Sequence, residues 1–293
     1  MSHLVRIRPK LLLADTEKTL LPKLEFLEAK GFSCLEIAKM LSIRPNVLGS
    51  SLDKQIKPAY DFLRNLLQSD KKVIAAAKRC PDILAHKKLP CLDILRGYGV
   101  SDANIATLVI YRPSFLMLSS DQSRKILERV VEIGFDASKI SFVLALNAFW
   151  SMSKSTWESK FDAYKKWGWS EEEVWEAFQR NPWCMMISED KLMGSMDFFI
   201  NQMGWRPCLM AKCPTILGLS LKKRVVPRCS VFQLLLSKGL VEKEVSINTL
   251  LLASEEKFLQ KFVARYEKKA PELLKMYKET LDLSNRPQIN DET

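Results

Sequence analysis

The sequence predicts an all-α solenoid, a stack of helical repeats of about 34 residues each. The main observation is a proline that leads a short apolar stretch and recurs in phase. The motif occurs as RPKLL at Pro9, RPNVL at Pro45, CPDIL at Pro81, RPSFL at Pro113, NPWCM at Pro182 and CPTIL at Pro214. These prolines are 36, 36, 32, 69 and 32 residues apart, and the step of 69 covers two periods. The chain also has only 10 glycines and no run that alternates like a β-strand, which disfavours a nucleotide-binding α/β fold.

Each repeat is predicted to begin with a helix that proline opens and glycine ends. Proline suits the first helical position because its missing N–H would have no partner there. Apolar helical patterns follow Pro22, Pro58, Pro90 and Pro227. A glycine that can take a left-handed conformation ends such a helix at Gly31, Gly99, Gly134, Gly168 and Gly204.

A second helix then starts at a capping residue two positions after the glycine. Ser33, Ser101, Asp136 and Ser170 occupy that position. Ser33 with Glu36 and Ser170 with Glu173 match the capping box. The repeat proline ends this helix, and the apolar residues after it are predicted to form one 3₁₀ turn in the core. The fourth repeat departs from the pattern, because NAFWSM has Ala148 where proline would stand.

The whole of residues 1–282 is expected to be one repeat domain that begins with a partial repeat. Residues 254–282 predict two terminal helices that are split at Pro271 and cap the last repeat. Residues 283–293, LSNRPQINDET, predict a polar, frayed tail.

Several function classes find no support in the sequence. The 7 cysteines form no C-x-x-C pair and read as core residues, and the 2 histidines lie far apart. No Walker loop, H-E-x-x-H or G-x-S-x-G motif is present, and no apolar run reaches the length of a membrane span. We therefore expect no enzyme, no cofactor, no metal, no small-molecule substrate and no membrane partner.

Positive charge is the remaining functional signal. Lys and Arg number 45 against 34 Asp and Glu, a net charge of +11 that favours a polyanionic partner, most commonly nucleic acid. A cation precedes the repeat proline by one or two positions at Arg8, Arg44, Arg79, Arg112, Arg180 and Lys212, and Lys222, Lys223, Arg224 and Arg228 follow. We predict that these residues contact backbone phosphates. The alternative is that they complement the dipole and free carbonyls of helix C-termini.

Aromatic residues are a second candidate for nucleic-acid contact. Trp150, Trp157, Trp167, Trp169, Trp175, Trp183 and Trp205 cluster in the second half and could stack on bases. Trp169 and Trp205 occupy the apolar position held by Phe32 elsewhere, so most of these residues are expected in the core.

From Pro9 to about Leu281, the proline motif that closes two helices resembles the mitochondrial transcription termination factor (mTERF) family. NPWCMMISEDKLMGSMDFFINQMGW and PRCSVFQLLLSKGL resemble its plant organellar branch. The resemblance implies a curved, left-handed superhelix with a basic concave groove that binds mainly double-stranded DNA in organellar transcription, including termination. It places Arg44, Arg79, Arg112, Arg180, Lys212 and the basic segment 222–228 in that groove. The fourth repeat, with Asn147 and Ala148, would weaken the groove there.

The resemblance also leaves alternatives open. Some plant members act in RNA processing or splicing, and a protein-binding helical scaffold is a rival reading. Tetratricopeptide repeats share the period, but their W-x₂-L-G and A-x₃-F signals are absent in phase. Pentatricopeptide repeats carry a late proline after a glycine-ended turn, whereas here the proline directly follows the second helix. We expect a monomer in mitochondria, or alternatively chloroplasts, although the chain begins inside a repeat and shows no targeting peptide.

Overall fold

The computed structural model describes residues 6, 9–86, 89–242 and 245–285, and within these ranges it contains helices and no β-strand. The chain divides into two compact units, residues 1–153 and 154–293, which we describe separately. The label η denotes a short 3₁₀ or π segment.

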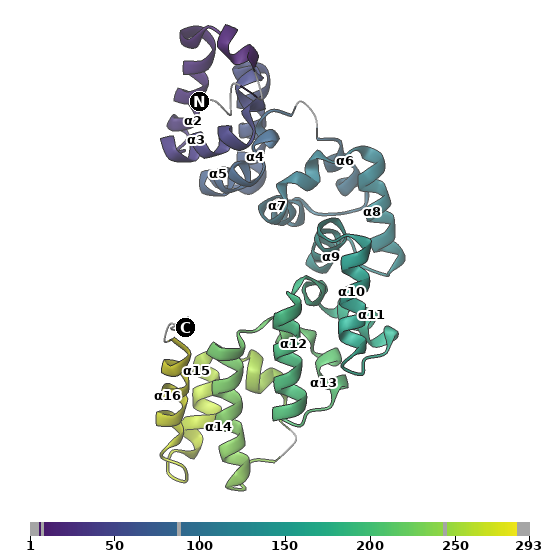
Figure 1. Ribbon diagram of the computed structural model, residues 1–293, viewed down its shortest axis with the longest axis vertical. Helices are drawn as coiled ribbons and strands as arrows, with labels where there is room; N and C mark the ends of the chain where they lie inside the picture. The colour runs from purple at the N-terminus through teal and green to yellow at the C-terminus, as the bar shows by residue number, and fades with distance from the viewer. Residues whose placement is uncertain (1–5, 7–8, 87–88, 243–244, 286–293) are drawn as a thin grey trace, which may run out of the picture. The chain divides into compact units, whose positions relative to one another are not determined.

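The first unit holds a partial repeat, three complete repeats and a fourth repeat that ends in α9 without a proline-led turn (Figure 1). Its elements are η1 (Pro9–Leu13), η2 (Thr16–Leu20), α2 (Leu21–Ala29), α3 (Cys34–Ile43), η3 (Pro45–Gly49), η4 (Leu52–Ile56), α4 (Lys57–Leu67), α5 (Asp70–Arg79), η5 (Pro81–Leu84), α6 (Pro90–Gly97), α7 (Asp102–Tyr111), η6 (Pro113–Met117), α8 (Ser120–Glu132) and α9 (Ile140–Ser151).

The second unit continues the same alternation to the end of the described chain. Its elements are α10 (Lys154–Lys165), α11 (Glu171–Arg180), η7 (Pro182–Met186), α12 (Glu189–Asp197), η8 (Phe198–Gln202), α13 (Pro207–Lys212), η9 (Pro214–Gly218), η10 (Leu221–Val225), α14 (Val226–Ser237), η11 (Asn248–Leu252), α15 (Glu255–Phe258), η12 (Leu259–Val263), η13 (Ala264–Tyr266) and α16 (Leu273–Asn285).

The repeat proline begins a 3₁₀ turn at all six predicted places, so this prediction is confirmed. The apolar residues after the proline fill the core: Phe115 and Leu116 are 0% exposed, as are Ile216 and Leu217. Burying such a side chain contributes about 1.5–3 kcal/mol, so each turn adds a substantial share of its repeat's core.

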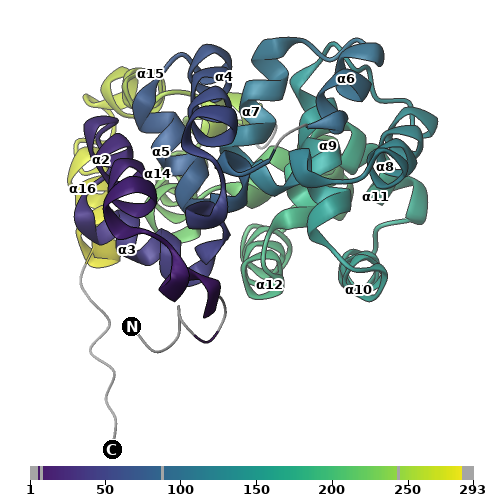
Figure 2. The same ribbon diagram turned by 90° about the horizontal axis from the view of Figure 1, so that it is seen from above.

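Second helices lie in a row within each unit. In the first unit α3 packs on α5, α5 on α7 and α7 on α9, and the turns η3, η5 and η6 form a parallel row. Figure 1 and Figure 2 both show α7 beside α9. In the second unit α11 packs on α13, and η7 on η9. Equivalent helix ends therefore lie next to one another along each row.

The glycine turns and both capping boxes are as predicted. The five predicted glycines have φ between 66° and 96°, and Gly239 has φ 65°. In the second repeat no glycine is available, and Gln68 takes the left-handed conformation instead, with φ 54°. Ser33 with Glu36 and Ser170 with Glu173 each form the reciprocal capping box.

The prediction that Asp136 caps a helix is wrong. Asp136 accepts hydrogen bonds from Ser138 in a turn, and α9 starts later, at Ile140.

All four first-helix prolines lie at the first or second position of an α-helix, as the sequence predicted. Pro90 opens α6 directly, whereas the helices that hold Pro22, Pro58 and Pro227 continue a helical segment that begins about one turn earlier. Each of these three helices starts with a π segment, η2, η4 or η10, capped by Asp15, Ser51 or Ser220. Proline lacks an N–H and clashes with the carbonyl of the preceding turn. In each of these three helices the residues ahead of the proline form a π turn instead of an α turn.

The C-terminal region is helical on both sides of Pro271. The helical run from Glu255 to Tyr266 and helix α16 are separated by a turn that contains Pro271. Helix α16 packs against α14 and continues to Asn285, so residues 283–285 are helical rather than part of a tail. The rest of the predicted tail, 286–293, lies outside the described residues.

Candidate nucleic-acid interface

The cations that precede the repeat proline all lie at the C-terminal end of a second helix. Arg44 and Arg112 follow the last residue of α3 and α7, and Arg79, Arg180 and Lys212 are the last residues of α5, α11 and α13. All five are exposed. Because second helices stand side by side, three of these cations share one edge of the first unit and two share one edge of the second. We call the five residues the helix-end cations. Arg8 lies outside the described residues.

Three of the helix-end cations donate a hydrogen bond to the next repeat. Arg79 donates from a terminal guanidinium nitrogen to the carbonyl of Ile110, near the end of α7. Arg180 donates in the same way to the carbonyl of Ala211 in α13, at 3.3 Å. Arg112 donates from Nε to Oδ1 of Asn147 at 3.0 Å. The alternative reading of the sequence, that arginines satisfy open helix-end carbonyls, is therefore visible in the structure for Arg79 and Arg180.

These contacts leave much of each guanidinium available. A guanidinium carries five N–H donors. Among the described residues Arg79 and Arg112 each use one, and neither has a carboxylate partner there. The contacts fix the direction of each side chain, which lowers the entropy lost when it binds a ligand.

Two helix-end cations form exposed ion pairs. Arg44 Nε lies 3.4 Å from Asp82 Oδ2, with the arginine side chain 60% exposed. Arg180 lies 3.0 Å from Glu176, one turn earlier in α11. Pairs at this level of exposure contribute roughly 0–1 kcal/mol, so a phosphate group could replace either carboxylate at little cost.

Three lysines form neither hydrogen bonds nor ion pairs through their side chains within the described residues. The ammonium groups of Lys212, Lys222 and Lys223 are exposed and have no hydrogen-bond or ion-pair partner in the part of the chain that the structure describes. Lys222 and Lys223 lie in η10, the capped start of the α14 helix. Their positions fit the prediction of a solvent-facing cationic surface.

Arg228 does not fit that prediction. Its side chain is 1% exposed, and Nη1 donates to the carbonyls of Leu250, Leu251 and Ala253 at 3.2, 3.3 and 2.8 Å. The guanidinium also lies over the ring of Phe258, 4.6 Å from its centroid, and burial lowers its pKa. A buried arginine cannot reach a polyanion, so we remove Arg228 from the candidate interface.

Arg224 is half-buried and, like Arg228, donates to backbone carbonyls at the end of η11. It donates from Nε to the carbonyl of Leu251 at 2.8 Å and from Nη2 to that of Ala253 at 2.6 Å. Together the two arginines hold the carbonyl end of η11 against α14. The basic segment 222–228 thus divides into two exposed lysines and two structural arginines.

Earlier repeats contain a similar hydrogen bond from a first helix to a backbone carbonyl, which the sequence analysis did not predict. A side chain of the first helix donates to the carbonyl at the end of the proline-led turn in the same repeat. The pairs are Lys23 with Leu48, Gln55 with Ala85, Lys160 with Ile187 and Lys191 with Gly218. The partners are 25 to 30 residues apart. A polar side chain on the inward face of a first helix is the sequence signal that could have identified them.

The fourth repeat lacks both the turn and the cation. Helix α9 runs through Ala148 to Ser151, and no 3₁₀ segment separates it from α10. Asn147 is buried, 2% exposed, and accepts the hydrogen bond from Arg112. No basic residue stands in the last turn of α9, so this repeat adds none to the helix-end cations.

Most tryptophans are at least partly buried. Trp169 is 3% exposed and stacks on Tyr164 with 4.6 Å between ring centroids, and Trp157 is 9% exposed. Trp150 and Trp183 remain 37% and 39% exposed. Trp183 follows Pro182 directly, close in sequence to Arg180.

Other kinds of site are not seen in the described ranges. No three His, Cys, Asp or Glu side chains gather there in a way that could hold a metal ion. None of the helices in these ranges is long and apolar enough to cross a membrane.

Fold and surface together define a class: helical-repeat proteins whose repeats close with a proline-led 3₁₀ turn and carry exposed cations at helix ends. A family model described as mTERF matches residues 1–182 and 91–259, so the chain belongs to the mTERF family. The family consists of nucleic-acid-binding regulators and not of enzymes.

Two relatives come from Arabidopsis thaliana. The chain is 23% identical over 247 residues to "Transcription termination factor MTERF15, mitochondrial", covering 83% of this chain and 47% of the relative. It is 22% identical over 260 residues to "Transcription termination factor MTERF8, chloroplastic", covering 75% of this chain and 51% of the relative. The chain thus spans about half the length of these relatives.

Proposed function

We propose that this protein binds nucleic acid, mainly double-stranded DNA, and regulates organellar transcription as a termination-type factor. The observation that carries the proposal is the recurrence of exposed cations at equivalent helix ends. The names of the two relatives, one mitochondrial and one chloroplastic, support the process and an organellar location. We place the protein in mitochondria, with chloroplasts as the alternative.

Backbone phosphates are the proposed ligands. Arg44, Arg79, Arg112, Arg180, Lys212, Lys222 and Lys223 supply seven exposed cations. Each phosphate that a cation neutralises releases counterions from DNA, so affinity falls as salt rises. Contacts of this kind position a protein on the duplex without reading its sequence. We also propose that these residues line a concave groove, as the family resemblance implies.

Binding to labelled nucleic acid across a KCl titration tests the proposal. Fluorescence anisotropy should show binding to duplex DNA with a slope of log K against log salt of up to about −6, the value for seven phosphate contacts. Affinity that does not change with salt, or an absence of binding at low salt, would contradict it.

RNA binding is the second candidate function. The exposed rings of Trp150 and Trp183 favour it, because aromatic side chains stack on unpaired bases. The same titration with single-stranded RNA separates the two. Tighter binding to the single strand, lost in Trp183→Ala, would replace duplex DNA with RNA as the ligand.

We also propose that residues 1–282 act as one monomeric repeat domain closed by residues 254–282. The ion pair between Lys238 and Glu272, at 2.6 Å, and the packing of Tyr277 against Phe258 support the closing role. A single thermal unfolding transition and a monomer mass by light scattering are the expected results. Two separate transitions or a dimer mass would contradict this part of the proposal.

A further inference from the structure

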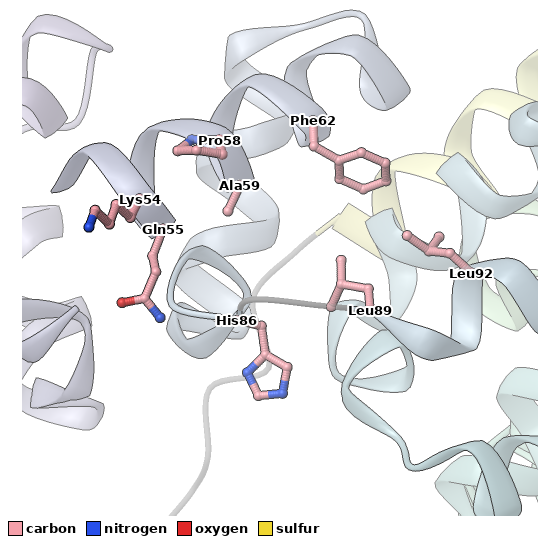
Figure 3. Close-up of a pocket in the computed structure, with 8 residues that line it drawn as sticks. All are labelled: Lys54, Gln55, Pro58, Ala59, Phe62, His86, Leu89 and Leu92. Carbon is pink, nitrogen blue, oxygen red and sulfur yellow. The ribbon is translucent and has the colours of Figure 1, made fainter. Parts of the chain in front are cut away.

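A small pocket lies between two first helices of the first unit, α4 and α6 (Figure 3). Its apolar wall comes from Pro58, Ala59 and Phe62 of α4 and from Leu89 and Leu92 at the start of α6. The side chains of Phe62, Leu89 and Leu92 turn toward one another around this space (Figure 3). None of the helix-end cations lines the pocket. It is therefore distinct from the candidate nucleic-acid interface.

The size of the pocket limits what it can hold. Its volume is about 210 Å³. Pockets that enclose a small-molecule ligand have volumes of roughly 300–1,000 Å³. The smaller space suits one or two apolar side chains that a partner inserts. Interfaces commonly obtain most of their affinity from such an anchor in a well-packed pocket.

The polar side of the pocket carries positive charge. Exposed Lys54 supplies that charge, exposed His86 lies on the same side, and no carboxylate lines the pocket among the described residues. The Lys54 ammonium has no partner among the described residues. Gln55, between them, is already engaged with the carbonyl of Ala85 at 3.2 Å. An occupant with a negative charge beside its apolar anchor would meet complementary charge, which raises its association rate and specificity.

We propose that this pocket, which we call the α4–α6 pocket, docks a protein segment in which a leucine or aromatic side chain stands next to an acidic residue. The apolar side chain inserts between Phe62 and Leu92. The carboxylate faces Lys54 and His86. The protein would then hold a protein partner through its first helices while its helix ends contact nucleic acid.

Selection from a phage-displayed library of random dodecapeptides tests the docking site. Enriched peptides should carry a leucine or aromatic residue within one helical turn of Asp or Glu. Ala59→Trp fills the pocket and should weaken the best peptide by at least about tenfold. Lys54→Glu should weaken it by about threefold or more at low salt, whereas Lys72→Glu, a matched exposed lysine on α5, should not.

Three outcomes would overturn the inference. One is a selection without such enrichment. Another is peptide binding that survives both Ala59→Trp and Lys54→Glu in variants that keep the wild-type melting temperature. The third is a loss of duplex DNA affinity in Ala59→Trp as large as the loss of peptide affinity, which would assign the pocket to the nucleic-acid surface. Failure of DNA binding by the unmodified protein would affect only the proposed function.

Discussion

Arg228 is the most deeply buried cation in the described part of the chain, and it ties the end of η11 to α14. Burying a guanidinium is costly unless its donors are paired. Three carbonyls and the ring of Phe258 compensate part of that cost, while Nε has no hydrogen-bond partner. The residue therefore stabilises the fold of the second unit.

Replacing Arg228 should destabilise the protein. Arg228→Met removes one donor from each of three carbonyls, of which only that of Leu250 has no second donor in Arg224, and should lower the free energy of unfolding by about 2 kcal/mol. Urea unfolding followed by circular dichroism measures the loss. Lys223→Met, a matched exposed cation, should stay within about 0.5 kcal/mol of the wild type. Equal stability of Arg228→Met and Lys223→Met would refute the structural role of Arg228.

Glu36 links two repeats and gives the stability a dependence on pH. Its carboxylate accepts a hydrogen bond from Lys78 at 2.6 Å and caps α3 through the backbone N–H of Ser33. The Lys78 ammonium, and then the Ser33 contacts, lower the pKa of Glu36 to about 2. The unfolded value is about 4.3. Because the folded pKa is the lower one, the carboxylate stabilises the fold above about pH 5, and this contribution is lost as pH falls towards 2.

Glu36→Gln keeps the capping geometry and removes the charge. We expect its melting temperature to be below that of the wild type at pH 7 and the difference to shrink steadily from pH 5 to pH 2. Thermal scans at several pH values measure this difference. If it stayed constant across that range, the ionised carboxylate would not be its source.

Among the elements, sequence reasoning succeeded where a local rule decides the structure. The turn that follows Pro113 forms because proline cannot continue α7, and the αL glycines end helices for a similarly local reason. It missed the π segments ahead of Pro22, Pro58 and Pro227, which start the helical run about one turn earlier. A π turn is a rare element that the position of a proline does not by itself predict.

In the candidate interface, too, some features follow from a local sequence rule and others do not. The repeat phase alone predicts that the five helix-end cations lie at the ends of second helices. It could not tell Lys223, which is exposed, from Arg228, which is buried, although both lie in one basic run. Burial there is decided by η11, more than 20 residues downstream, which supplies the carbonyls that Arg228 contacts.

The fourth repeat offers a test of the proline rule. Ala148 is 0% exposed within α9, and its helix continues without a 3₁₀ turn. Proline there removes a helical hydrogen bond and clashes with the preceding turn, so Ala148→Pro should cost about 3 kcal/mol of unfolding free energy. Differential scanning calorimetry measures the loss. A variant as stable as the wild type would mean that the repeat accepts the break, contrary to the continuous helix.

Across the molecule, net charge alone does not locate the partner. Exposed lysines also lie outside the set proposed to bind phosphates: Lys39 on α3, Lys125 on α8 and Lys257 on α15. A polyanion attracted only by the net charge of +11 would be insensitive to which lysines are removed. Phosphates held at defined positions would depend on Lys212, Lys222 and Lys223, whose ammonium groups make no contact that the fold needs within the described chain.

Comparing two triple variants in the salt dependence of duplex DNA binding therefore tests the nucleic-acid interface most directly. Both variants replace three lysines by glutamine: Lys212, Lys222 and Lys223 in one, and Lys39, Lys125 and Lys257 in the other. We predict that the first reduces the magnitude of the slope of log K against log salt by about 3 and that the second leaves it at the wild-type value. Equal slopes for the two variants would contradict the proposed interface.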